Sequence, residues 1–277
     1  MSKDFILTTS RNDKLRISAF GIENIEVAPC LIFVHGFKGF KDWGFGPYLA
    51  DYFETKGYFV ITFNFSHNGI GETLTEFTEL EKFAENTFSL EIDELSELIS
   101  AYLNDFFGKS KNKKLGLLGH SRGGAVSLLT TGRFRNIRAV AVWASVANLN
   151  RYSERQKEKW RKKGVFEVIN SRTKQKMKLY VSLLDDLERN SNGSLNIQNA
   201  VGNLHKPLLI CHGEEDLAVP VEEGEMIYNW SDKSSAEFFK IPATGHTFGI
   251  KHPFEGTNNK FETLLNKTEI FFKKNIF

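Results

Sequence analysis

The sequence of 277 residues predicts an α/β fold, with a mostly parallel sheet of about eight strands and helices on both faces. Three observations predict it. Short apolar runs recur along the chain, helical patterns alternate with them, and one long polar segment interrupts this alternation. Strand–helix alternation is typical of βαβ units, in which crossover helices cover a parallel sheet.

Eight apolar runs have the length and composition of strands. They lie at 5–8, 15–20, 30–34, 59–63, 115–118, 137–143, 208–211 and 238–241. The central runs are almost continuously hydrophobic, which indicates strands that are buried on both faces. The first two runs are separated only by SRND, which predicts a hairpin or meander at the start of the sheet.

Helical patterns fill most of the intervals between these runs. They lie at 47–56, 88–107, 125–134, 222–230 and 260–275. Residues 148–204 carry no strand pattern and predict two or three polar helices, roughly 151–163 and 172–189, with a loop at 190–196. Such an insertion is typical of a cap over a site. We therefore expect one domain, with an α/β core at 1–147 and 205–277 and a helical cap at 148–204.

Composition narrows the classes of function. The net charge is +2, which argues against a dedicated nucleic-acid partner, and no run of 18 apolar residues predicts a membrane span. No signal peptide is visible, and Cys30 and Cys211 lie in apolar runs, so we expect free thiols and a cytoplasmic location. Charge is uneven: residues 72–105 are acidic and residues 150–178 are basic. Solvated helix faces are the favoured interpretation, with an anionic partner as the alternative.

The most informative motif is LGLLGHSRGG at 115–124. A strand, a glycine-bounded turn and a helix start around Ser121 predict a nucleophile elbow. Gly119 and Gly123 leave room for a strained turn, and the helix N-terminus favours negative charge beside the serine.

A serine hydroxyl needs a base, and His246 is the best candidate among seven histidines. It follows the last strand and is preceded by Gly245, which allows close approach. His67 also follows a strand and is kept as a residue that could face the site.

The base needs a carboxylate to fix its tautomer, and Asp216 is the predicted acid. It lies in the turn CHGEEDLAVP after a strand. Glu215 is the alternative, Glu214 is expected to be solvated, and the pair Asp185–Asp186 in the insertion is a remote possibility. The backbone N–H groups of Phe37, in HGFKG, and Arg122 are the predicted oxyanion donors.

By these residues the chain resembles the α/β-hydrolase superfamily, over about residues 27–275. The order Ser121, Asp216, His246 matches that of the superfamily, and HGF at 35–37 resembles its oxyanion loop. The segments HGFKGFKDWG, FNFSHNG and HTFGIKHPF look most like bacterial serine esterases of the dienelactone-hydrolase-like and feruloyl-esterase-like groups. The resemblance implies ester hydrolysis through an acyl-enzyme, with no metal or organic cofactor. Dienelactone hydrolases proper use a cysteine nucleophile, where this chain has Ser121.

The expected substrate is a small-molecule ester. Trp143, Trp160 and Met177 offer apolar surface for substrate, with core packing as the alternative, and His67 is a further candidate contact. A serine aminopeptidase-like peptide hydrolase and a thioesterase are the alternative enzymes, and a ligand-binding module on a decayed site is the non-enzymatic one. The sequence makes no prediction about oligomeric state.

Overall fold

The computed structural model describes residues 2–277 and places eight strands in one sheet, ordered β1-β2-β4-β3-β5-β6-β9-β10. The strands are β1 (Lys3–Thr8), β2 (Lys14–Phe20), β3 (Cys30–Val34), β4 (Phe59–Asn64), β5 (Leu115–His120), β6 (Ile137–Trp143), β9 (Leu208–Gly213) and β10 (Ala236–Ile241). β1 and β2 form an antiparallel pair and β2 runs antiparallel to β4, whereas the other neighbours are parallel. The predicted fold class and all eight predicted strands are confirmed.

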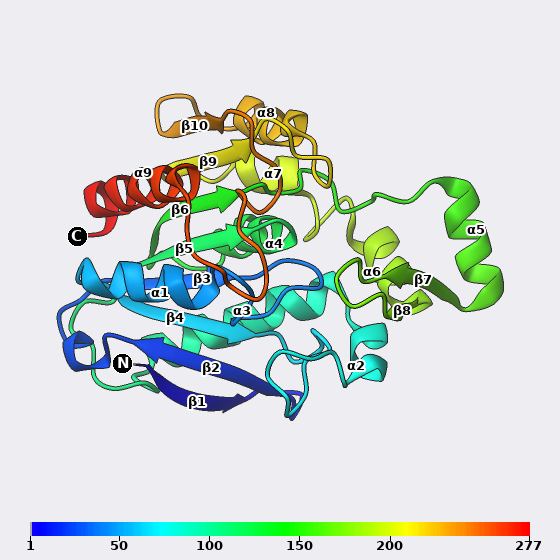
Figure 1. The fold of residues 1–277 in the computed structure, drawn as a ribbon, viewed down its shortest axis with the longest axis horizontal. Coiled ribbons are helices and arrows are strands. Elements are labelled where there is room, and N and C mark those ends of the chain that lie inside the picture. Colours follow the sequence, from blue (N-terminus) through cyan, green and yellow to red (C-terminus); the bar gives the residue numbers. More distant parts are fainter. Residues whose placement is uncertain (1) are drawn as a thin grey trace.

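Helices cover both faces of this sheet (Figure 1). The helices of one face are α1 (Gly46–Thr55) and α9 (Asn259–Ile276), and those of the other are α3 (Phe88–Leu103), α4 (Arg122–Thr131) and α8 (Val221–Trp230). Alternation along β3 separates the two cores: Leu31 and Phe33 pack with α1 and α9, whereas Ile32 and Val34 pack with α3 and α4. Successive strand side chains point to opposite faces, so a continuously apolar strand fills both layers. The short helices α2 (Leu80–Glu85) and α7 (Ile197–Gly202) were not predicted.

The insertion differs from its prediction. It contains α5 (Glu154–Lys163), a hairpin of β7 (Val165–Ile169) and β8 (Lys176–Tyr180), and α6 (Val181–Asn190). The helix expected from residue 172 is therefore wrong over 172–180. Met177 and Leu179 alternate with exposed lysines and are almost fully buried, which is the period of a strand. The many lysines and arginines hid this short alternation.

Apart from α7, which packs against α4 and α8, the insertion lies beyond the carboxyl ends of the parallel strands (Figure 1). Its apolar side chains, including Trp160 and Leu183, belong to the same hydrophobic cluster as α3 and α4. Cys30 and Cys211 are buried free thiols. Over residues 2–277, no helix has both the length and the apolar composition that a membrane crossing requires.

Candidate active site

Ser121 sits at the turn between β5 and α4. Its φ of 57° and ψ of −122° lie outside the regions that non-glycine residues favour, and its N–H donates to the Trp143 carbonyl at 2.8 Å. The two elbow glycines are required by close backbone contacts. A Cβ on Gly119 would lie 2.4 Å from the Gly123 oxygen, and one on Gly123 would lie 2.2 Å from the Val34 oxygen. The turn can therefore form only because both side chains are absent.

Asp216 and His246 are joined by a short hydrogen bond. His246 Nδ1 donates to Asp216 Oδ2 at 2.7 Å, and Asp216 Oδ1 accepts the N–H groups of Ala218 and Val219, each at 2.9 Å. Burial alone would raise the pKa of Asp216, but the hydrogen bonds from His212 and His246 hold that pKa well below its usual range. A charged carboxylate thus fixes the imidazole with the proton on Nδ1, which leaves Nε2 to accept a proton.

Two further histidines support this pair. His212 Nε2 donates to the Val219 carbonyl at 2.8 Å and lies 3.5 Å from Asp216 Oδ2. His120 Nε2 donates to the His246 carbonyl at 2.9 Å, and the two rings are 4.8 Å apart. Burial, together with the charge of His246, lowers the pKa of His120 to about 3, so this ring is neutral at physiological pH. In the sequence both were among the seven histidines from which the base was chosen, and neither was predicted to support it.

Ser121 and His246 line the same cavity, of about 540 Å³. Within the part of the chain that the structure describes, the Ser121 hydroxyl makes no hydrogen bond, so its contact with the base is not formed in this structure. Such contacts are often long in unliganded enzymes and tighten when substrate binds.

The loop after β3 packs directly on the elbow. A Cβ on Gly36 would lie 2.9 Å from the Ser121 Cβ and 3.0 Å from the His120 oxygen, so only glycine fits there. The next residue, Phe37, lines the cavity with Arg122. Neither backbone N–H donates to an acceptor within residues 2–277, and both are therefore free to bind an oxyanion.

The Arg122 side chain is held in a buried aromatic site. Its guanidinium lies 4.1 Å from the centre of the Phe37 ring and 4.7 Å from that of Phe88. Its Nη1 lies 3.4 Å from Glu91 Oε1, which also accepts from Asn86 at 2.7 Å. Burial raises the pKa of Glu91, and the charge of Arg122 opposes that rise. This site was not predicted, because one sequence gives no sign that Glu91 and Arg122 meet.

The model of the prolyl oligopeptidase family matches residues 47–275 of the chain. The chain belongs to this family. The matched range contains Ser121, Asp216 and His246 and begins after the loop of Phe37. Membership supports the predicted α/β-hydrolase superfamily and the general class of hydrolase. No curated protein matches the chain significantly in sequence.

Solved structures share the fold at low sequence identity. Est1E from Butyrivibrio proteoclasticus, solved with bound ferulic acid, superposes with a TM-score of 0.74 at 17% identity, over 100% of this chain and 99% of that one. The α/β-hydrolase GrgF from Penicillium sp. sh18 gives 0.71 at 19% identity, over 100% and 99%. The esterase domain from a Rhodothermus marinus protein gives 0.67 at 16% identity, over 100% of both chains.

Three predicted substrate contacts lie outside the cavity of this family member. Trp143, Trp160 and Met177 are 0% exposed and do not line it. Trp143 points to the α1 and α9 face, where its Nε1 donates to Thr268 Oγ1 at 3.0 Å. Trp160 packs on Tyr152 and Phe166, and Met177 belongs to the hydrophobic cluster that the insertion shares with α3 and α4. The assignment of these three to substrate is therefore corrected: they are core residues.

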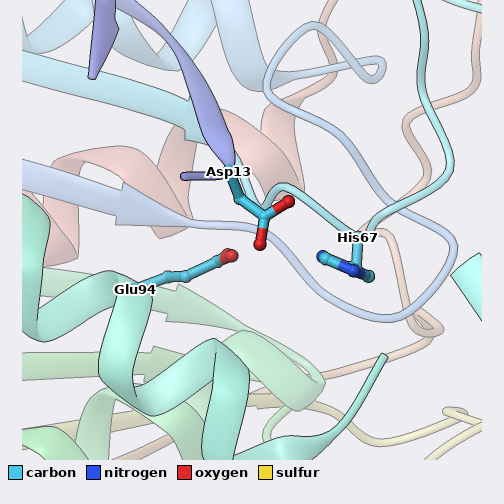
Figure 2. A group of neighbouring side chains, drawn as sticks. All are labelled: Asp13, His67 and Glu94. Atoms are coloured by element: carbon cyan, nitrogen blue, oxygen red, sulfur yellow. The ribbon is translucent and has the colours of Figure 1, made fainter. Parts of the chain in front are cut away.

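His67 also lies outside the cavity lining. Figure 2 shows it pointing toward Asp13, directly before β2, and Glu94, on α3. One ligand-type atom from each of the three side chains lies within 4.8 Å of the others. Glu94 accepts from the Ser66 N–H at 3.0 Å, and burial raises its pKa to about 7. The structure thus places the half-buried His67 in a polar cluster with Asp13 and the buried Glu94, and not beside Ser121.

The remaining wall of the cavity comes from the insertion. The hairpin turn contributes Asn170, Ser171 and Arg172, and the segment before α5 contributes Arg151 and Tyr152. All five lie in the basic segment 150–178, and Arg151 and Arg172 are the two basic residues among them.

Proposed function

We propose that the protein hydrolyses carboxylic esters of small molecules through an acyl-enzyme on Ser121. The observation that carries the proposal is the 2.7 Å bond between His246 and the buried Asp216, at a cavity that Ser121 also lines.

The proposed reaction has two halves. Ser121 Oγ attacks the ester carbonyl carbon while its proton passes to His246 Nε2, and Asp216 stabilises the resulting imidazolium. The tetrahedral intermediate collapses when the bond to the alcohol oxygen breaks and His246 returns the proton to that oxygen. Water then attacks the acyl-enzyme with His246 as base, which releases the acid and restores the serine.

The N–H groups of Phe37 and Arg122 would bind the oxyanion in both halves. Their lack of acceptors within residues 2–277 supports this role, since a donor aimed at developing charge is most effective when it needs no reorganisation. One such donor contributes roughly 3–4 kcal/mol to the barrier.

A small-peptide hydrolase is the second candidate, because the matching family is named for an oligopeptidase. Cleavage next to a free amine would require an acidic anchor. Within the described residues, the cavity is lined by no aspartate or glutamate. This composition favours the ester over an aminopeptidase-like substrate.

Activity-based labelling tests the proposal. A fluorophosphonate probe should label the wild-type protein at Ser121, located by peptide mapping, and should leave Ser121→Ala unlabelled. An exposed serine far from the cavity offers the matched control, since Ser194→Ala should label normally. Ethyl hexanoate and an aminoacyl anilide then separate the two candidates. Labelling of Ser121→Ala equal to wild type would overturn the assignment.

A further inference from the structure

The lining of the cavity contains lysine and arginine but no acidic residue among those that the structure describes. Four cationic side chains line it: Lys38, Arg122, Arg151 and Arg172. Among the described lining residues there is no carboxylate to balance them.

Two of these cations, Arg122 and Arg151, pair with carboxylates that do not line the cavity. Arg122 lies 3.4 Å from the buried carboxylate of Glu91, and Arg151 pairs with Glu223. Both glutamates lie outside the cavity wall, so these arginines add little net charge to it.

The other two have no such partner. Within residues 2–277, neither Lys38 nor Arg172 forms an ion pair. Lys38 Nζ donates to the Ile169 carbonyl at 3.2 Å, which leaves further donor protons free. The guanidinium of Arg172 lies 5.9 Å from the centre of the Phe40 ring.

Both contacts join the same two loops. Lys38 and Phe40 lie in the loop after β3, and Ile169 and Arg172 lie at the hairpin of the insertion. The two unpaired cations therefore flank one junction in the cavity wall, beside the apolar rings of Phe40 and Trp43.

We propose that this junction is an anion subsite, so that the ester substrate carries a carboxylate or phosphate group bound by Lys38 and Arg172. The inference rests on the proposed esterase function and adds its substrate class. The aromatic wall contacts the carbon chain that separates the anion from the scissile ester. Arginine and lysine bind such anions through charge-assisted hydrogen bonds, which a neutral substrate of the same length cannot form.

Matched esters test the subsite. Monoethyl adipate should be cleaved with a higher kcat/KM than ethyl hexanoate, and monoethyl suberate with a higher one than ethyl octanoate. Arg172→Gln and Lys38→Gln should each lower kcat/KM for the anionic esters about 10- to 100-fold, the range expected for losing a hydrogen bond to a charged group. The neutral esters should change less than about twofold, a shift worth under ~0.5 kcal/mol.

Lys176→Gln is the matched control, because this exposed lysine on β8 removes the same charge from the same hairpin without lining the cavity. It should affect neither ester class. Equal losses on neutral and anionic esters, or equal effects of Lys176→Gln and Arg172→Gln, would overturn the subsite and leave the esterase assignment intact.

A binding measurement separates this inference from catalysis. By calorimetry, the Ser121→Ala variant should bind adipate and hexyl phosphate more tightly than adipamide. The double variant with both Ser121→Ala and Arg172→Gln should bind all three with equal affinity. The relative affinities of adipate and hexyl phosphate distinguish a carboxylate from a phosphate. Equal binding of adipate and adipamide, or no binding of either anion, would overturn the subsite, whereas unlabelled wild-type Ser121 would instead overturn the proposed function.

Discussion

The guanidinium of Arg122 lies 4.1 Å from the centre of the Phe37 ring, so the two residues that offer free N–H groups beside Ser121 are also stacked through their side chains. Phe37 in turn stacks on Phe83, with ring centres 5.4 Å apart. The separation of the two backbone donors is therefore fixed by side-chain packing as well as by the backbone.

Phe37→Leu tests this coupling, because it keeps the backbone N–H and removes the ring. A buried cation–π contact contributes up to about 2 kcal/mol, so we expect kcat to fall about tenfold with a smaller change in KM. Steady-state kinetics on ethyl hexanoate measure the split. Phe254→Leu, at a more exposed ring that stacks on Tyr48, is the control and should leave kcat unchanged. An unchanged kcat in a destabilised Phe37→Leu protein would show that the stack serves only the fold.

Asp216→Asn tests the predicted acid. The amide cannot hold the imidazole in the tautomer with its proton on Nδ1, so kcat should fall by about 10⁴-fold while the protein stays folded. Glu215→Gln is the matched control, since this neighbouring carboxylate is exposed. Should Glu215→Gln lose the activity instead, the alternative acid named from the sequence would replace Asp216.

Gly36→Ala tests the contact between the loop after β3 and the elbow. The added Cβ would meet the Ser121 Cβ at 2.9 Å, so either the loop or the serine must shift. A displacement near 1 Å lowers rates about 100-fold, and we expect a loss of that order in kcat/KM. Gly132→Ala is the control, because nothing lies within 4 Å of its added Cβ and its φ is −63°. Comparable activity in the two variants would contradict the close packing.

The cluster of Asp13, His67 and Glu94 predicts a pH-dependent stability. Burial raises the pKa of Glu94 from 4.5 to about 7, against the hydrogen bonds from Ser66 and with the help of the charges of Glu91 and Asp13. Burial also lowers the pKa of His67. A raised carboxyl pKa means that the folded state binds the proton more tightly, so its stabilising contribution is complete below about pH 4.5 and is lost as the pH rises through 7.

Glu94→Gln keeps a neutral side chain at every pH and should remove this loss. Between pH 5 and pH 8 the wild type should lose up to about 3 kcal/mol more of its unfolding free energy than the variant does. Urea titrations at the two pH values measure the difference. Glu158→Gln, at an exposed glutamate of α5, should follow the wild type. Parallel pH profiles for wild type and Glu94→Gln would contradict the raised pKa.

The order of strands and helices could be predicted because strands that are buried on both faces of a sheet have almost continuously apolar sequences. The turn around Ser121 could be predicted because a Cβ at Gly119 or Gly123 would lie less than 2.5 Å from a backbone oxygen, so both positions require glycine. The meeting of Asp216 with His246 followed from the topology, since both follow neighbouring parallel strands, β9 and β10.

Other features depend on contacts that no local pattern encodes. Trp143 and Val142 are neighbours in the chain but belong to opposite layers, and the sequence does not reveal which layer faces the cavity. The hairpin of the insertion was missed because each of its strands has only five residues. So short an alternation, among many lysines and arginines, cannot be distinguished from a polar helix. The junction of Lys38 and Arg172 could not be predicted for the same reason, because the hairpin turn brings Ile169 and Arg172 to the loop after β3.

His120 donates to the carbonyl of His246, so the strand that ends at the serine also grips the loop with the imidazole. The end of β5 and the loop of His246 therefore depend on each other. Transferring only one of them into a related protein would separate the His120 donor from its acceptor, so chimaeras of such enzymes should exchange both segments together.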